Sequence, residues 1–404
     1  MASLFEEAGI RLHYQKGVRL MPLGTFRPAA LSLEDISLFP SPKIARRALI
    51  VTFAGYHDFF TQFLSQGLEK QGISCRIQQL GLAELDALRQ SPGEMRSVQI
   101  ARTMDRNWEK VVQEIRILLQ DEDTVILPQV FGLQDLSVPG RIRQGIPARI
   151  VFAGTMPPSV PGIRTQMLLK RRFEVLGGTY LMGDEALRAH IHDGVVHSIV
   201  TRNLDNHYLE ADHFILASGG FFSKGLKSNP FQVSEPVFGL DVTYAEDRNS
   251  WYAPEFKSDQ PYMDFGVQTD AALHGILQGE PLNNLFVIGS ILGATRPEFG
   301  TGAGLAVRSA FAAVDQILPS TPDPNETTGI HHQQAQFRRV HEVHDMYCVL
   351  SCPSGKSYVS GAQAGRSGRR TSPAQGPLLL QLRAQVLYEL QALRSRLPVR
   401  RQSG

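Results

Sequence analysis

Residues 283–313 read NNLFVIGSILGATRPEFGTGAGLAVRSAFAA and are the stretch that decides the fold. An apolar run over residues 285–288 stops at Gly289, a glycine-dense loop follows, and a small-residue pattern typical of a helix begins near Gly302. A strand, a tight loop and a helix N-terminus together form a cradle for a phosphate or another electron-rich group, because unpaired backbone N–H groups face it. The stretch therefore predicts a ligand site late in an α/β protein.

The composition limits the class of protein and the number of domains. The chain has 404 residues, of which 42% are hydrophobic and 20% are charged, which allows two or three domains with a real core. The formal net charge of +2 gives no argument for a nucleic-acid partner. The start of the chain lacks the pattern of a secretory leader, no apolar run is long enough to span a membrane, and three cysteines are too few for a disulfide framework. We therefore expect a cytoplasmic protein.

The chain reads as four regions. Residues 1–44 combine a short helix pattern with a loop rich in proline and glycine. Residues 45–150 alternate apolar strands with helical patterns, which indicates an α/β region with a parallel or mixed sheet. Residues 151–320 read as a β-meander that ends in the strand, loop and helix quoted above. Residues 321–404 read as a linker and a basic low-complexity tail, which we predict to be disordered.

A second glycine cluster lies in HFILASGGFFSKGL, residues 213–226. Apolar residues run there into Ser218, Gly219 and Gly220, and such small residues at a strand end let backbone amides approach a planar or phosphorylated ligand. A tight turn that needs a positive φ would explain the double glycine as well. A third strand-like segment, GVQTD, ends at Asp270.

The order of these segments resembles the C-terminal part of flavoproteins, in which a helix N-terminus faces the pyrimidine edge of the isoalloxazine ring. The physical chemistry fits, since a reduced flavin carries negative charge that unpaired N–H groups and the helix dipole stabilise. An ordinary helix–strand contact through small residues is the alternative explanation. The candidate cofactor-binding residues are Ser218, Gly219, Gly220, Asp270, Gly289, Ser290, Gly300, Gly302 and Gly304.

Several separated motifs narrow the resemblance to one family. MPLGTFRP, MPPSVPGIR, HFILASGGFFSKGL, EPVFGLDV and NNLFVIGSILG occur in one order, and together they resemble the B subunit of anaerobic glycerol-3-phosphate dehydrogenase. The resemblance extends from about residue 1 to about residue 318. It implies an FAD/NAD(P)-binding-like, Rossmann-type flavoprotein fold with an α/β inserted region.

The resemblance also implies a function. The family oxidises sn-glycerol 3-phosphate to dihydroxyacetone phosphate and passes the electrons to a quinone. Its B subunit is described with FMN, while FAD is compatible with the fold. The implied partners are an FAD-containing catalytic A subunit and an iron–sulfur C subunit, which holds the complex at the inner face of the cell membrane.

Two departures from the family pattern lead to further expectations. No strand with a G-x-G-x-x-G-like turn opens the chain, and GTGAGL at 300–305 does not replace it, since no acidic residue closes a following strand. We therefore expect the first βαβ unit to be missing and flavin binding by the chain itself to be weak or absent. The Arg-rich tail suggests out-of-frame read-through. A non-catalytic scaffold subunit or a defunct truncated product remain alternatives to an active subunit.

Two arginines are candidates for the substrate phosphate, because the planar guanidinium forms paired, charge-assisted bonds with phosphate oxygens. Arg164 follows a Pro/Gly loop, and Arg296 lies in the loop before the late glycines. No histidine stands out as a catalytic base. His341, His344, Cys348 and Cys352 have spacings that a Zn²⁺ site tolerates, yet we predict no metal site because no folded surroundings are evident.

Overall fold

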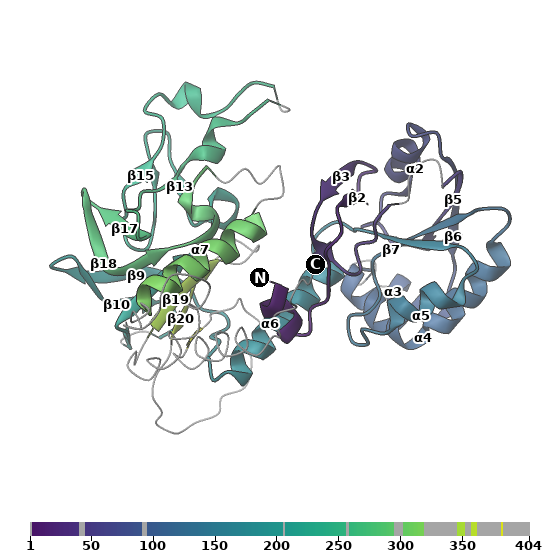
Figure 1. Ribbon diagram of the computed structural model, residues 1–404, viewed down its shortest axis with the longest axis horizontal. Coiled ribbons are helices and arrows are strands. Elements are labelled where there is room, and N and C mark those ends of the chain that lie inside the picture. Colours follow the sequence, from purple (N-terminus) through teal and green to yellow (C-terminus); the bar gives the residue numbers. More distant parts are fainter. Residues whose placement is uncertain are drawn as a thin grey trace, which may run out of the picture. The chain divides into compact units, whose positions relative to one another are not determined.

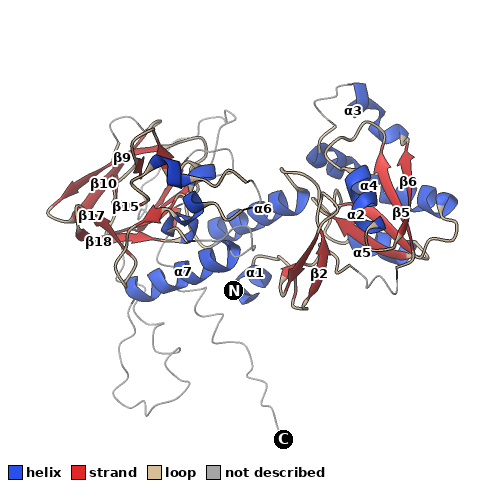
Figure 2. Ribbon diagram, turned by 90° about the horizontal axis from the view of Figure 1, so that it is seen from above, coloured by secondary structure: helices blue, strands red, loops and turns tan. Residues whose placement is uncertain are grey.

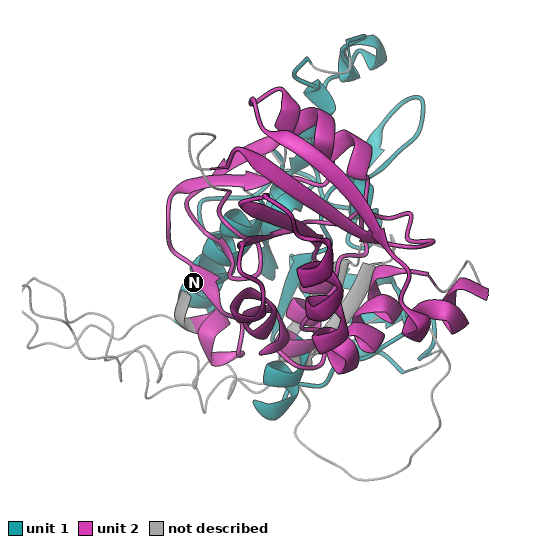
Figure 3. Cartoon of the chain, turned by 90° about the vertical axis from the view of Figure 1, so that its right-hand side faces the viewer, with its two compact units in different colours: residues 1, 170–404 teal, residues 2–169 magenta. Residues whose placement is uncertain are grey.

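The computed structural model describes residues 2–39, 45–90, 95–204, 207–255, 258–294 and 302–318, together with the backbone of three strands between residues 346 and 382. The chain divides into two compact units, residues 2–169 and residues 170–404 with residue 1 (Figure 3). The sequence-based boundary at residue 150 falls inside a strand of the first of these, and residues 2–39 belong to the same unit. Among the described residues, no helix has the length and apolarity needed to cross a bilayer.

A four-stranded parallel sheet forms the centre of the unit made by residues 2–169. Its spatial order is β6-β5-β7-β8. The strands are β5 (Arg47–Phe53), β6 (Ser74–Leu80), β7 (Thr124–Pro128) and β8 (Arg149–Ala153). Six of the seven β5 residues are buried, which is why the strand reads as a continuous apolar run. Helix α2 lies on one face of the sheet, and α4 and α5 lie on the other (Figure 1).

The helices of this unit follow the apolar periodicity of the sequence. They are α1 (Ala2–Glu7), α2 (Thr61–Glu69), α3 (Asp86–Gln90), α4 (Ser97–Leu118), α5 (Val138–Gly145) and α6 (Val160–Val175), with the 3₁₀ turn η1 (Ala83–Leu85). α2 packs through Leu64 and Leu68, and the chain leaves the helix at Gly72, whose φ of +78° favours glycine. Helix α6 runs across the boundary between the two units.

Short hairpin-like pairs occupy residues 12–33. Strand β1 (Leu12–His13) pairs with β4 (Ser32–Leu33), and β2 (Gly17–Leu20) pairs with β3 (Phe26–Ala29). Arg19 is 2% exposed, and its guanidinium donates to Ser32 Oγ and to the carbonyl oxygens of Gly17, Ala29 and Gln15. A buried arginine with its N–H groups satisfied in this way holds the two pairs together.

The second unit is built on a sheet of order β17-β18-β12-β19-β20, with β21 paired to β19. These strands are β12 (His213–Ala217), β17 (His274–Leu277), β18 (Glu280–Val287), β19 (Met346–Ser351), β20 (Ser357–Gly361) and β21 (Gln381–Leu382). β12 and β18 run parallel. Helix α7 (Gly302–Ile317) covers one face of the sheet through Ala313 and Ile317, which pack on Ile215 and Phe286 (Figure 2).

An antiparallel sheet, β11-β10-β9, follows α6 in the chain. Its strands are β9 (Ala186–His192), β10 (Val195–Thr201) and β11 (Leu209–Glu210). Asp193 and Gly194 connect β9 to β10 with φ values of +49° and +72°. Two consecutive positive φ angles at an Asp-Gly pair form the turn that matches the twist of a β-hairpin.

Short elements complete the second unit. They are β13 (Lys227–Ser228), β14 (Val233–Ser234), β15 (Val242–Thr243), β16 (Gly266–Val267) and the 3₁₀ turns η3 (Phe221–Ser223), η4 (Arg248–Trp251), η5 (Pro261–Asp264) and η6 (Gly289–Leu292). The core beneath them contains Trp251 and Phe265, whose ring centroids are 5.8 Å apart.

The structure confirms the α/β class, and it differs from the expectations in detail. Within the β-meander expected over residues 151–320, residues 179–184 form no extended strand, and GVQTD is a strand only at its first two residues. In the tail, β19 pairs in parallel with β12 over five residues, so this part of residues 321–404 belongs to a sheet. Most of the low-complexity stretch 360–376, and His341, His344 and Cys352, lie outside the described residues.

Candidate flavin site

The ends of β12 and β18 lie at one edge of the sheet. Their register pairs Leu216 with Val287, so the residues that follow, Ser218 in one strand and Gly289 in the other, leave the sheet side by side. The turn at Asp270 lies at the same edge, because β17 runs antiparallel to β18 and His274 is opposite Phe286. The structure therefore brings together three of the segments that the sequence selected.

Gly289 is tied to helix α7. Its backbone N–H donates to Ser309 Oγ over 2.9 Å, and that hydroxyl donates in turn to the Leu305 carbonyl oxygen over 2.7 Å. Gly289 and Ser309 are both buried, with exposure of 5% for Ser309. This bond fixes the position of the loop after β18 relative to the first turns of α7.

Replacing Ser309 by alanine is expected to destabilise the second unit by about 1–3 kcal/mol, because the buried Gly289 N–H then has no acceptor. Urea unfolding followed by circular dichroism measures the change. Ser65→Ala is a matched control in α2, since Ser65 Oγ donates to the Glu69 carboxylate and its described partners are side chains, so that its loss leaves none of the described backbone N–H groups unpaired. Equal destabilisation by the two substitutions would contradict this role for Ser309.

The turn after β12 is built with almost no free space. Gly219 has a φ of +74°, and a Cβ on Gly225 would overlap the Gly219 carbonyl oxygen. Ser218 is fully buried, and its Oγ has no hydrogen-bond partner among the described residues. A buried hydroxyl without a partner is costly, so a group that accepts or donates a bond there would stabilise the turn.

The segment after β18 is packed with similar closeness. η6 ends at Gly293, whose φ is +71°, and a Cβ on Gly266 would overlap the Gly293 backbone. β16 and η6 thus approach each other backbone to backbone, which only glycine allows. At the C-terminal ends of β12 and β18 the surface is therefore formed by main-chain groups of glycines and not by side chains.

Asp270 holds its own turn. Its Oδ1 accepts from the backbone N–H groups of Ala272 and His274 at 2.9 and 2.8 Å, and its Oδ2 lies 2.9 Å from His274 Nδ1. Burial pushes the pKa of Asp270 up, but the side-chain and backbone hydrogen bonds from His274 outweigh it, and the net pKa lies below the ordinary value of 3.8. The carboxylate therefore stabilises the turn before β17, and the partners described for it are groups of Ala272 and His274.

Replacing Asp270 by asparagine is expected to lower stability by about 1 kcal/mol near neutral pH and by less at about pH 3. A carboxylate whose pKa is depressed by folding contributes stability above its unfolded pKa, and that contribution is lost as the pH falls through the folded value. Urea unfolding of both proteins at the two pH values tests this. A loss that does not change with pH would refute it.

The remaining predicted residues have different outcomes. Gly302 and Gly304 open α7, and a Cβ at either position would meet no described atom within 4 Å. Gly300 and Arg296 lie outside the described residues. Arg164 belongs to the other unit; it is 8% exposed, pairs with Asp35 and donates to the Gly132 carbonyl oxygen. Burial lowers the pKa of Arg164 to about 10.

Comparisons with known proteins identify the family of this chain. The FAD binding domain family matches residues 1–305. The B subunit of anaerobic glycerol-3-phosphate dehydrogenase from Pectobacterium atrosepticum is 38% identical over 326 residues, covering 78% of this chain and 77% of its own length. The chain belongs to this B-subunit family. The corresponding B subunits of Yersinia pseudotuberculosis and Glaesserella parasuis are each 36% identical, over 74% and 75% of this chain and 72% and 74% of their own lengths. No solved structure gives a significant match.

Membership in the B-subunit family and the FAD binding domain make this a flavoprotein oxidoreductase, and the edge described above fits a flavin. The buried Ser218 Oγ lacks a partner among the described residues, the turns at Gly219 and Gly289 present main chain, and α7 begins with Gly302 and Gly304. These are groups that hydrogen-bond a heteroaromatic ring and stabilise negative charge on it.

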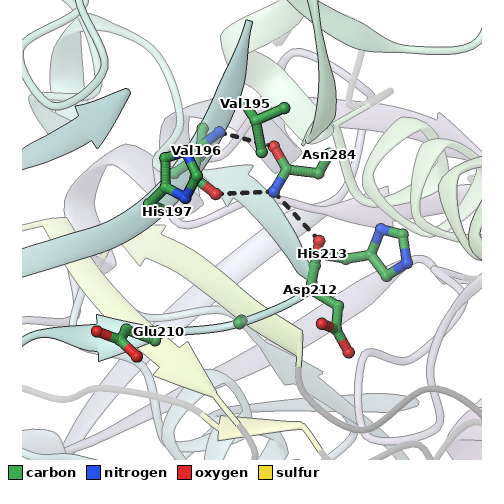
Figure 4. Close-up of a pocket in the computed structure, with 8 residues that line it drawn as sticks. Val195, Val196, His197, Glu210, Asp212, His213 and Asn284 are labelled. Atoms are coloured by element: carbon green, nitrogen blue, oxygen red, sulfur yellow. Dashed lines mark hydrogen bonds between the residues drawn. The ribbon is translucent and has the colours of Figure 1, made fainter. Parts of the chain in front are cut away.

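A cavity lies at the N-terminal end of β12, beside the sheet β11-β10-β9. It has a volume of about 450 Å³ and contains His197, Glu210, Asp212, His213 and Asn284 in its wall (Figure 4). Asn284 bridges the strands, accepting from Val196 N–H and donating to the carbonyl oxygens of Val196 and Asp212. His213 is the first residue of β12, and the register places Asn284 of β18 beside it, so this cavity lies at the N-terminal end of β12, away from the glycine-built edge. No group of metal-ligating side chains converges in the described parts of the chain.

Proposed function

We propose that the chain is the flavin-bearing B subunit of a glycerol-3-phosphate dehydrogenase of anaerobic respiration. In this proposal sn-glycerol 3-phosphate is oxidised to dihydroxyacetone phosphate, and the two electrons removed from it reach a quinone. The observation that carries the proposal is the 38% identity to a named B subunit over 78% of the chain, in a protein whose strand ends form a glycine-built edge.

FMN is the proposed cofactor, and FAD is the alternative. The flavin supplies the electron-transfer chemistry when bound. The residues proposed to hold it are the predicted set, with Ser218, Gly219 and Gly220 after β12 and Gly289 and Ser290 after β18 as its centre. Gly302 and Gly304, which begin α7, complete the proposed set, since the first N–H groups of a helix favour negative charge on a ring bound there.

The proposed partners are an FAD-containing catalytic A subunit and an iron–sulfur C subunit, which attaches the complex to the inner face of the cell membrane. The name of the relatives, which marks them as the B subunit of an enzyme, supports an assembly of several chains. Nucleic acid is not part of the proposal, in keeping with a net charge of +2.

A non-catalytic scaffold subunit is the second candidate function. Arg164, proposed to bind the substrate phosphate, has its guanidinium paired with Asp35 and Gly132, so a phosphate would have to displace a carboxylate. Arg296 is the other proposed phosphate ligand. A scaffold would need neither arginine, and it would bind the catalytic A subunit without carrying a flavin of its own.

Co-expression with the A and C subunits tests the proposal. The active protein is expected to co-purify with both, to contribute flavin beyond that of the A subunit, and to support glycerol-3-phosphate-dependent quinone reduction. A complex that assembles and turns over with flavin in the catalytic chain alone would favour the scaffold, while failure to bind that chain would refute both.

A further inference from the structure

The parallel sheet of residues 2–169 divides toward its C-terminal edge. β5 is paired with β6 through its last residue, Phe53, and β7 is paired with β8 through its last residue, Pro128. The two central strands, β5 and β7, are paired with each other only as far as Ile50 and Ile126. The chain leaves β5 for β6 on one side and returns to β7 on the other, so the strands part at the switch point of the sheet. Open α/β sheets bind ligands at such a point.

A buried amide without a described partner lies at this switch point. Gln129 directly follows β7 and is 2% exposed, and neither its Oε1 nor its Nε2 has a hydrogen-bond partner among the described residues. Its backbone N–H donates to the Ala153 carbonyl oxygen over 3.0 Å, so the strand geometry of β7 continues through this residue. Burying both polar ends of a carboxamide unbonded costs free energy. A ligand that offers a donor and an acceptor would recover that cost.

Gln129 lies on the face of the sheet that α4 and α5 cover. Side chains alternate along a strand, so Gln129 shares a face with Leu127. Leu127 is in register with Phe152 of β8, and the Arg143 guanidinium of α5 lies over the Phe152 ring at 4.9 Å. Helix α4 lies on this face as well (Figure 1). The Gln129 side chain therefore leaves the sheet toward α4 and α5 and not toward α2.

The start of α4 lies at the same edge of the sheet. Ser97 Oγ lies 2.6 Å from the hydroxyl of Tyr56, which follows β5, and donates over 3.5 Å to the hydroxyl of Thr155, which follows β8. The N–H groups of residues 97–99 precede the first helical hydrogen bond, and the Arg96 side chain does not cap them. Unpaired N–H groups at a helix start attract an anion.

The charged and neutral groups at this edge are arranged in two parts. Arg96 Nη1 donates to Asp58 Oδ1 over 2.8 Å, and the Arg96 side chain is 61% exposed, so its guanidinium stays accessible while it neutralises the carboxylate. Burial raises the pKa of Tyr56 to about 12, so that its hydroxyl keeps its proton. The edge thus combines a cationic end, at the start of α4, with neutral hydroxyl and amide groups.

This combination selects the class of ligand. We propose that the edge binds a small phosphate ester, whose phosphate oxygens accept from the N–H groups of residues 97–99 and from Arg96, and whose hydroxyl or carbonyl group bonds the Gln129 amide. A helix start beside a guanidinium binds phosphate oxygens, and a carboxamide both donates and accepts. The site goes beyond the proposed function, because residues 2–169 contain none of the proposed flavin contacts.

Isothermal titration calorimetry of the full chain tests the binding. Glycerol 2-phosphate is the probe, because it carries a phosphate and two hydroxyls but lacks the secondary hydroxyl that the proposed dehydrogenase oxidises. We expect saturable binding at one site per chain. Glycerol should give no binding heat, and inorganic phosphate should bind at least about threefold more weakly, since it cannot bond the amide through a hydroxylated arm.

Gln129→Met is the decisive variant, because methionine keeps the length of the side chain and removes both polar atoms. It is expected to raise the Kd of glycerol 2-phosphate at least about tenfold, and to unfold in urea no earlier than the wild type, since a buried unpaired amide is lost. Thr52→Val is the matched control. Thr52 is 7% exposed and its Oγ1 also has no described partner, but it alternates with Ile50 onto the opposite face of the sheet. Its Kd should equal that of the wild type.

Four results would overturn the inference. They are the absence of saturable binding, equal affinity for inorganic phosphate, equal Kd values for the two variants, and earlier unfolding of Gln129→Met, which would make the amide a structural group. The flavin contacts lie in the other unit and no turnover is measured. Failure here is therefore distinct from failure of the proposed dehydrogenase function.

Discussion

Replacing Glu235 by glutamine is expected to destabilise the second unit by about 2–4 kcal/mol. Glu235 is 2% exposed, and its carboxylate closes the loop that follows β14. Oε1 accepts from Val237 N–H at 2.9 Å, while Oε2 accepts from Phe238 N–H at 2.7 Å and from Gly239 N–H at 3.0 Å. Glutamine keeps the shape of the side chain, but its NH₂ group replaces one of the two accepting oxygens. That NH₂ group would face a backbone N–H of the loop, which would then have no acceptor.

A matched control separates this effect from the loss of a carboxylate in general. Asp247 accepts from Asn249 N–H at 2.9 Å at the start of η4, on the surface of the same unit. Asp247→Asn should change stability by less than about 0.5 kcal/mol, since asparagine caps as well as aspartate. Urea unfolding measured by tryptophan fluorescence gives both values, and a Glu235→Gln loss no larger than that of the control would contradict the argument.

The parallel sheet of residues 45–169 could be predicted from the sequence. The alternation of strands and helices expected over residues 45–150 contains β5, β6 and β7. β5 and β7 are recognisable as apolar runs, whereas β6, SCRIQQL, mixes polar and apolar residues. β8 was missed, although Arg149–Ala153 is an apolar run of the same kind. The Pro- and Gly-rich segment after it suggested a domain boundary, whereas the pairing of β8 with β7 places the strand inside the unit.

The candidate site was predictable only in its main-chain parts. Gly219, Gly289 and Gly293 have positive φ values, and glycine is the residue that marks such positions in a sequence. The role of Ser309 was not predictable, since a serine within a helix pattern gives no sign that its hydroxyl accepts from a loop N–H 20 residues earlier. The contact between the rings of Phe221 and Tyr262 was not predictable for a similar reason: the two residues are 41 positions apart and meet only through the fold.

Most of the tail lies outside the described residues, and a short part of it pairs with a strand of the second unit. A segment rich in arginine and small residues predicts disorder, because it offers little apolar surface to bury. Within that tail, Met346–Ser351 is a short apolar run, and the open edge of β12 provides unpaired backbone groups that a strand can satisfy. Composition alone gives no information on whether a partner edge exists.

Replacing Gly225 by alanine is expected to have the largest effect on the flavin site itself. The new Cβ would overlap the Gly219 carbonyl oxygen and lie within 2.7 Å of Ser218 Oγ, so the turn after β12 must move. Such overpacking costs about 1–3 kcal/mol or more, and here the displaced atoms are the proposed flavin contacts. We expect a flavin content at least about tenfold below that of the wild type, since 1.4 kcal/mol corresponds to a factor of ten in binding.

Gly140→Ala is the matched control, because it makes the same substitution where a Cβ has free space. Gly140 lies within α5 of the other unit, a Cβ there meets nothing within 4 Å, and alanine is favoured over glycine in a helix by about 0.5–1 kcal/mol. This variant should keep its flavin and unfold no earlier than the wild type. If Gly225→Ala lost stability but retained flavin stoichiometrically in the assembled complex, the turn would be a structural element only, and the flavin would have to bind away from the end of β12.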